Sequence, residues 1–282
     1  MELLSENLYN NVCLDISKLT TKKYSTSFSL GIAALDKKFH NPIYAIYGFV
    51  RFADEIVDTF HSSNKNELLQ RFKADTYKAI EEKISLNPIL HSFQMVVNKY
   101  SIEKELIDSF LYSMEMDLQK IEYDVEKYKL YILGSAEVVG LMCLRVFCEG
   151  NNEYYLSLKK PAMQLGSAFQ KINFLRDLKA DFFQLGRTYF PEIKSNVFNN
   201  DVKLQIEQDI LVDFQAGYKG IKLLPKGSRF GVYLAYSYYL SLFNKIKKLD
   251  AELVLKERIR VTDTKKYLIL VWSYIKHKLN LI

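Results

Sequence analysis

The chain has 282 residues, of which 49% are hydrophobic and 26% are charged, and its formal net charge is +6. This is the composition of an ordinary globular protein with enough apolar material for a sizeable core. The charge is too small to indicate a nucleic-acid partner. The three cysteines, Cys13, Cys143 and Cys148, have neither disulfide-framework nor zinc-type spacing, so a disulfide scaffold and a zinc domain are excluded.

The distribution of breakers and apolar residues predicts helices throughout. Only 11 glycines and 5 prolines interrupt the chain, and no window alternates apolar and polar residues as a half-buried strand would. Good helix formers fill residues 67–85, 102–119 and 206–223. Polar breaks separate the helical stretches at residues 61–66, 87–88, 149–153, 194–201 and 224–228. We predict an all-α fold of seven to ten helices in one domain, residues 1–282.

Residues 42–59 (PIYAIYGFVRFADEIVDT) carry the first chemically informative pattern. Pro42 suits the first turn of a helix. On that helix four polar side chains fall within an arc of about 60°, and the remaining positions are mostly apolar. The four are Tyr47, Arg51, Asp54 and Asp58. Such a helix should be buried, and its carboxylates then need cations, a metal ion or hydrogen bonds. A solvated stripe with an Arg51–Asp54 ion pair is the alternative interpretation.

Residues 160–183 (KPAMQLGSAFQKINFLRDLKADFF) repeat this pattern. Asn173, Asp177 and Asp181 lie four residues apart, on one side of a helix. The same side continues backward through small or neutral polar residues, which are Ala162, Gly166, Ser167 and Gln170. A glycine inside a helix costs about 1 kcal/mol relative to alanine, so Gly166 indicates that something approaches the backbone closely.

Two such polar seams on largely buried helices favour a site for divalent cations and phosphate. Magnesium prefers a few carboxylates, several waters and substrate phosphate oxygens, and arginines such as Arg51, Arg176 and Arg187 could supply further donors. Neither seam contains a glycine-rich phosphate loop, so a nucleotide P-loop is not supported. A buried structural ion network is the alternative.

At this point the sequence resembles the squalene/phytoene synthase family. Asp54–Asp58 (DEIVD) and Asn173–Asp181 (NFLRDLKAD) are similar to its two aspartate-rich motifs, and residues 186–191 (GRTYFP) to the segment that follows the second motif. Residues 24–28 (YSTSF) and 131–140 (YILGSAEVVG) also resemble family segments, with weaker similarity at residues 114–118, Tyr239 and Arg258. Glu137 departs from the pattern, because many members carry a small residue there.

The resemblance implies an all-α isoprenoid synthase fold with a central cavity, and an enzyme that joins two prenyl diphosphates head to head. The expected reaction converts geranylgeranyl diphosphate to phytoene through a cyclopropyl diphosphate, within carotenoid biosynthesis. C30 squalene or dehydrosqualene synthesis from farnesyl diphosphate is one alternative. A non-catalytic relative that binds lipids or assists assembly is another, and a terpene cyclase is a third.

Carried over position by position, the resemblance assigns roles to three groups of residues. Those implied to hold the Mg²⁺, for which Mn²⁺ could substitute, are Asp54, Asp58, Asp177 and Asp181. Those implied to act in catalysis are Tyr47, Arg51, Asp117, Tyr131 and Arg176. Those implied to bind substrate are Ser25, Ser27, Phe28, Gln170, Asn173, Arg187, Tyr189 and Arg258. NADPH is not expected if the product is phytoene.

The partners and location follow from the same analysis. We expect prenyl diphosphate substrates, no nucleic acid and a cytoplasmic protein that can touch membranes without crossing them. The acidic N-terminus lacks the apolar region of a signal peptide. The apolar run at residues 267–275 is about half of what a bilayer span needs. The sequence leaves the oligomeric state open.

Overall fold

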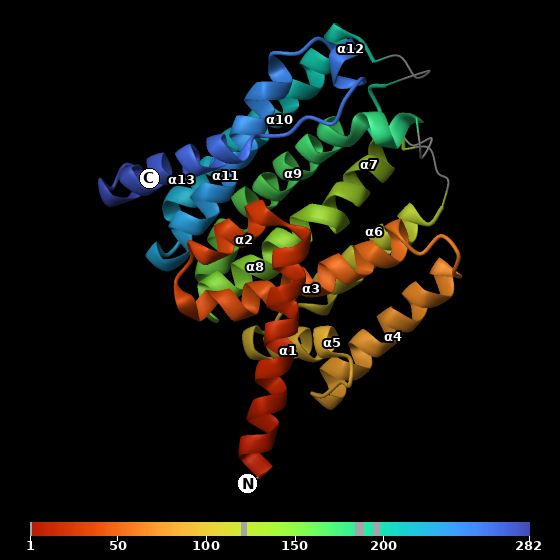
Figure 1. The fold of residues 1–282 in the computed structure, drawn as a ribbon, viewed down its shortest axis with the longest axis vertical. Helices are drawn as coiled ribbons and strands as arrows, with labels where there is room; N and C mark the ends of the chain where they lie inside the picture. Colours follow the sequence, from red (N-terminus) through yellow and green to blue (C-terminus); the bar gives the residue numbers. More distant parts are fainter. Residues whose placement is uncertain (1, 120–122, 184–188, 194–197) are drawn as a thin grey trace.

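The computed structural model describes residues 2–119, 123–183, 189–193 and 198–282, with the backbone alone described at residues 2–4 and 181–183. All regular secondary structure in these ranges is helical, which confirms the predicted fold class (Figure 1). The first half of the chain contributes α1 (Glu2–Tyr24), α2 (Thr26–Ala33), α3 (Lys37–Asp58), α4 (Lys65–Glu82), α5 (Pro88–Tyr100) and α6 (Lys104–Asp117). The second half contributes α7 (Val125–Ile132), the π-helical η1 (Leu133–Glu137), α8 (Val138–Cys148), α9 (Asn152–Phe183), α10 (Asn200–Leu223), α11 (Lys226–Lys247), α12 (Ala251–Val254) and α13 (Asp263–Lys278).

The described ranges hold more helices than the seven to ten predicted. Short helices such as α2 and α12 span only a few apolar residues, too few to show a period. The expectation for Pro42 was also wrong, because α3 begins at Lys37 and Pro42 lies inside it. Pro42 is buried, and the packing of this helix outweighs the hydrogen bond that a proline cannot donate.

Two large hydrophobic clusters form most of the core, and α9 joins them. The first cluster comes mainly from α2 to α6 and α8, and it includes Tyr155 and Leu158 from the beginning of α9. The second comes mainly from α7 and α9 to α12, and it includes Ile172 and Leu175 from the later part of α9. A helix of 32 residues is about 48 Å long, so α9 runs past both clusters and supports the region between them.

The helices cross at close range beside this region. A Cβ added to Gly166 of α9 would lie 2.8 Å from the carbonyl oxygen of Ala136 in η1. Real side chains do not approach a backbone oxygen so closely, so this crossing requires glycine. The close approach inferred from the sequence at Gly166 is therefore confirmed, and its partner is the π-helical turn.

The segment Val125–Cys148, which contains α7, η1 and α8, has the length and hydropathy of a membrane span, with a mean hydropathy of 1.7 over its most apolar window. Half of that window is buried inside the protein. The segment packs against both α6 and α9. Its apolar character is what a helix between two others needs.

Candidate active site

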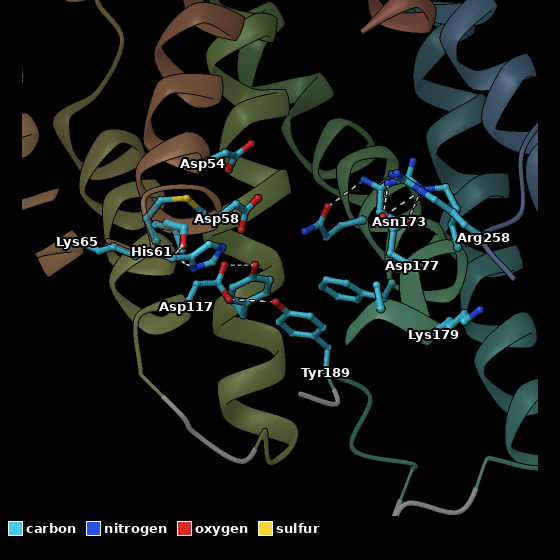
Figure 2. A pocket seen from close by; sticks show the side chains of 17 residues that line it. Asp54, Asp58, His61, Lys65, Asp117, Asn173, Asp177, Lys179, Tyr189 and Arg258 are labelled. Carbon is cyan, nitrogen blue, oxygen red and sulfur yellow. Dashed lines mark hydrogen bonds and ion pairs between the residues drawn. The ribbon is translucent and has the colours of Figure 1, made fainter. Parts of the chain in front are cut away.

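A polar cleft of about 730 Å³ lies where the C-terminal ends of α3, α6 and α9 meet. Figure 2 shows Asp54 and Asp58 on one side of this cleft and Asn173, Asp177 and Arg258 on the opposite side. The exposed carbonyls at helix C-termini carry partial negative charge, and three such ends add to the charge of the carboxylates. The cleft therefore favours cations.

The α3 side combines carboxylates with a half-buried arginine. Arg51 forms an ion pair with Glu55, and its guanidinium lies 4.4 Å from the centre of the Tyr24 ring. The Arg51 Nη1 atom lies 3.8 Å from Asp54 Oδ2. Arg51 Nε is buried without a hydrogen-bond partner among the described residues. A buried guanidinium N–H is costly to leave unpaired, so Arg51 has a donor to offer to an oxygen of a bound ligand.

Asp54 lies in an environment that resists its ionisation. Burial raises its pKa, and the negative charge of Asp58 raises it further. Arg51 opposes these effects, whereas Asp117 adds to them, and the pKa of Asp54 reaches about 7. The ionised form of Asp54 is therefore disfavoured in the protein alone, by burial first and by the neighbouring carboxylates second. A bound cation would reverse this preference.

The α9 side holds its polar groups in two separate sets of contacts. Asn173 donates to Gln170 across 3.1 Å and accepts from the hydroxyl of Tyr239 across 3.2 Å. Asp177 pairs with its neighbour Arg176, and Arg258 Nε lies 2.7 Å from Asp177 Oδ1. Arg258 comes from the connection between α12 and α13. An arginine from a distant part of the chain therefore pairs with the carboxylate of the second wall, as Figure 2 shows.

Asp117, at the end of α6, connects two tyrosines at the edge of the cleft. Its carboxylate accepts a hydrogen bond of 2.5 Å from the hydroxyl of Tyr131 and one of 3.0 Å from the hydroxyl of Tyr189. The two rings stack with centroids 4.9 Å apart, and Phe174 stacks on Tyr189 at 4.3 Å. Burial and the charge of Asp117 raise the pKa of Tyr131 well above its usual value, so this phenol remains a neutral donor.

An apolar cavity of about 510 Å³ lies next to the cleft and shares part of its wall. Residues of α2, α3, η1, α8, α9, α10 and α11 line it, which confirms the expected arrangement of helices around a central cavity. The residues common to the cleft and the cavity are Asp54, Gln170, Asn173, Arg176 and Arg258. The acidic site therefore lies at the entrance of a hydrophobic chamber.

The structure brings most of the expected site residues to these two spaces. Those that line the cleft, the cavity or both are Ser25, Phe28, Tyr47, Arg51, Asp54, Asp58, Asp117, Tyr131, Gln170, Asn173, Arg176, Asp177, Tyr189 and Arg258. Ser27 lines neither space. Ser167, placed on the polar side of α9 from the sequence, is buried away from the cavity and donates to Asp213 of α10. Arg187 and the side chain of Asp181 lie outside the described residues.

Several lining residues were not identified from the sequence. The cleft also includes His61, Lys65 and Lys179, which add basic groups around the acidic walls (Figure 2). Glu55, rather than Asp54, is the close partner of Arg51. A glutamate four residues after an arginine is a standard helical ion pair, so the sequence did contain that signal. Nothing local to His61 or Lys179 indicates where the helices bring them.

The described side chains contain no cluster of three or more His, Cys, Asp or Glu groups that could hold a metal ion by themselves. Any divalent cation in the cleft would therefore take few ligands from the described side chains and complete its shell with water and ligand oxygens. Magnesium is commonly bound in this way, with one or two carboxylates and substrate phosphates. The available donors are carboxylate and amide oxygens, which suit a hard cation.

The fold and site define an all-helical protein in which an acidic cleft opens beside an apolar chamber. The profile of the squalene/phytoene synthase family matches residues 21–196. The chain is 25% identical over 268 residues to the 4,4'-diapophytoene synthase of Staphylococcus haemolyticus. This alignment covers 87% of this chain and 90% of that protein. It is 24% identical to the phytoene synthase of Arthrospira platensis over 93% of this chain and 92% of that protein. It spans 66% of the length of the chloroplastic phytoene synthase 1 of Zea mays.

Solved structures show the same fold. A dehydrosqualene synthase superposes with a TM-score of 0.81 at 20% identity, covering 96% of this chain and 98% of that one. A squalene synthase from Alicyclobacillus acidocaldarius superposes with a TM-score of 0.70 at 17% identity, covering 86% of this chain and 95% of that one. The chain belongs to the squalene/phytoene synthase family.

Proposed function

We propose that the protein joins two prenyl diphosphates head to head, with geranylgeranyl diphosphate as substrate and phytoene as product. One observation carries this proposal: carboxylates from α3 and α9 face each other across a cleft that shares its lining with an apolar cavity. A prenyl diphosphate has a strongly anionic head and a long apolar chain. The cleft can hold the head and the cavity can hold the chain.

Magnesium fits the cleft, because the carboxylates of Asp54, Asp58 and Asp177 line it and offer the oxygen ligands that this hard cation prefers. Asp54 and Asp58 on one wall and Asp177 on the other would offer one or two carboxylates to each bound Mg²⁺, with water and diphosphate oxygens as the remaining ligands. Asp181 is the expected further ligand. When bound, Mg²⁺ stabilises the charge that develops on a diphosphate leaving group. Arg51, with its unpaired buried Nε, and Arg176 and Arg258 at the shared wall supply further donors.

The reaction balances as two ionisations and two proton losses. The first substrate loses its diphosphate, and the resulting allylic cation alkylates the 2,3 double bond of the second. Loss of a proton closes a cyclopropylcarbinyl diphosphate. Loss of the second diphosphate, rearrangement and loss of another proton give the linear hydrocarbon.

The protein's own contribution is to hold the chains in reactive geometry and to keep water away from the cations. Tyr131, Phe174 and Tyr189 line the cleft as a stack of aromatic rings. Aromatic faces attract cations at short range. The hydrogen bonds from Tyr131 and Tyr189 to Asp117 fix the orientation of two of these rings.

C30 synthesis from farnesyl diphosphate is the second candidate. It is favoured by the similarity to a 4,4'-diapophytoene synthase and to the structure of a dehydrosqualene synthase. The two activities share the same cleft chemistry and differ in the length of chain that the cavity accepts.

The test is to incubate the purified protein and Mg²⁺ with C15 and C20 diphosphates separately, with and without NADPH, and to identify the hydrocarbon. We expect phytoene from the C20 substrate without NADPH. A C30 product from the C15 substrate alone would replace the proposal with the second candidate. Absence of both hydrocarbon and diphosphate release would refute an enzymatic function.

A further inference from the structure

The helix α13 presents an apolar stripe to solvent. Leu268, Val271, Trp272 and Ile275 fall within an arc of about 100° when α13 is projected down its axis. All four are exposed, and Leu268 and Trp272 each keep 61% of their accessible surface. Contiguous apolar surface of this kind marks a site of interaction.

The opposite face of α13 is held against the body of the protein. Ser273 is 2% exposed, and the ring of His277 stacks on Phe230 of α11 with centroids 5.0 Å apart. In Figure 1, α13 lies along the edge of the molecule next to α11. The orientation of the stripe is therefore fixed by packing, and its apolar side chains face outward from a firmly docked helix.

Basic residues border the stripe on both sides. Lys265 and Lys276 project along one edge and Lys278 along the other. The Lys276 ammonium lies 6.0 Å from the ring centre of Trp272. Asp263, in the first turn, is the one acidic residue of α13. Two copies of this surface would bring like charges together, which disfavours self-association and favours an anionic partner.

We propose that this stripe docks the protein on the surface of an anionic lipid bilayer. A helix with an apolar face bordered by lysines lies in the plane of a membrane interface, with its apolar residues among the acyl chains. Tryptophan and tyrosine are enriched at that depth, and lysines extend their ammonium groups to the lipid headgroups. The stripe combines these features with no segment that must cross the bilayer.

Docking here would place the apolar cavity close to the membrane. Gly231, Val232 and Ala235 of α11 line the cavity, and α11 also packs against α13. The cavity is therefore one helix away from the docked surface. Water-insoluble chains would have a short path between bilayer and chamber, although the docking itself does not depend on the proposed reaction.

Trp272 provides a direct test, because it is the only tryptophan in the chain. The full-length protein is mixed with vesicles of phosphatidylcholine and phosphatidylglycerol in equal parts, or of phosphatidylcholine alone. With the anionic vesicles we expect the emission of Trp272 to move to shorter wavelength, bromine-labelled acyl chains to quench it, and the protein to float with the vesicles. The Lys265→Gln/Lys278→Gln variant should lose about fivefold in affinity for anionic vesicles per lysine removed.

A second variant isolates the apolar stripe. Leu268→Gln/Ile275→Gln should weaken vesicle binding at least about tenfold, because the binding loses the favourable free energy of transferring two apolar side chains from water to the acyl chains. The matched control is Leu8→Gln/Leu19→Gln on α1, where both leucines are also exposed, and it should bind as the unmodified protein does. Circular dichroism confirms that each variant is folded.

Three results would overturn the proposal. One is Trp272 emission that does not change with anionic vesicles. Another is flotation of the Leu268→Gln/Ile275→Gln variant equal to that of the control. The third is a blue shift that grows with protein concentration in the absence of lipid, which would show that a second copy covers the stripe. None of these results depends on whether the protein makes a hydrocarbon.

Discussion

Glu137 lies in η1 beside a buried ion network, and its replacement by glutamine should stabilise the protein at alkaline pH. Lys171 of α9 pairs with Asp209 and, at 2.7 Å, with Asp213 of α10. Burial is the largest cause that raises the pKa of Glu137, the charge of Asp213 adds to it, and Lys171 opposes it. The pKa of Glu137 reaches about 7. The single charge of Lys171 cannot neutralise the carboxylates of Asp209, Asp213 and Glu137 together.

The direction of the pH effect follows from this shift. Between the ordinary glutamate pKa and about 7, the folded state binds more protons than the unfolded state. The stability contributed by protonated Glu137 is therefore complete below the ordinary pKa and is lost as the pH rises through the folded value. The difference between the ordinary glutamate pKa of 4.5 and about 7 corresponds to about 3 kcal/mol. We halve this because the side chain is only partly buried and solvent screens it.

Raising the pH from 5 to 8.5 should consequently increase the free energy of unfolding of the Glu137→Gln protein by about 1.5 kcal/mol relative to that of the unmodified protein. Urea unfolding at the two pH values measures this, and thermal unfolding should show a gain of about 3–6 °C. The matched control is Glu81→Gln on the exposed surface of α4, which should change stability by no more than about 0.5 kcal/mol at either pH. A Glu137→Gln effect that is the same at both pH values would show that the reasoning is wrong.

Three further predictions concern the cleft and the helix crossing. Asp177→Asn should lower the rate of hydrocarbon formation from labelled prenyl diphosphate at least about 100-fold, since it removes one key electrostatic contact. Tyr131→Phe should lower the free energy of unfolding, measured in urea, by about 1.5–3 kcal/mol, because the carboxylate of Asp117 loses a hydrogen bond. Gly166→Ala should lower the free energy of unfolding by about 1–3 kcal/mol, because the new Cβ would clash with the Ala136 carbonyl oxygen.

Matched variants control each of these. Asp75→Asn, on the exposed surface of α4, should retain normal turnover. Tyr112→Phe changes a tyrosine that is 47% exposed and should leave stability within about 0.5 kcal/mol. Gly31→Ala places a Cβ at ordinary contact distance, 3.6 Å from its nearest neighbour, and should be tolerated. Equal losses in a variant and its control would contradict the specific contact proposed for that variant.

The sequence by itself determined the helical class and both acidic seams. Helical spacing is a local property, so Asp54 and Asp58 on α3, and Asn173 and Asp177 on α9, could be placed on common helix faces before any fold was known. The family resemblance added the expectation that the two faces meet, and the cleft confirms that they do. The expectation for Pro42 failed because proline marks a first turn only as a tendency.

Only the tertiary structure decided which distant residues share the site. Tyr189 is 72 residues from Asp117, its hydrogen-bond partner, and Arg258 reaches Asp177 from a connection with no helical period. The outward orientation of the stripe on α13 depends likewise on which face packs against α11. Periodicity fixes the direction of a side chain around its own helix. The packing of one helix on another, which depends on the whole core, decides what that side chain meets.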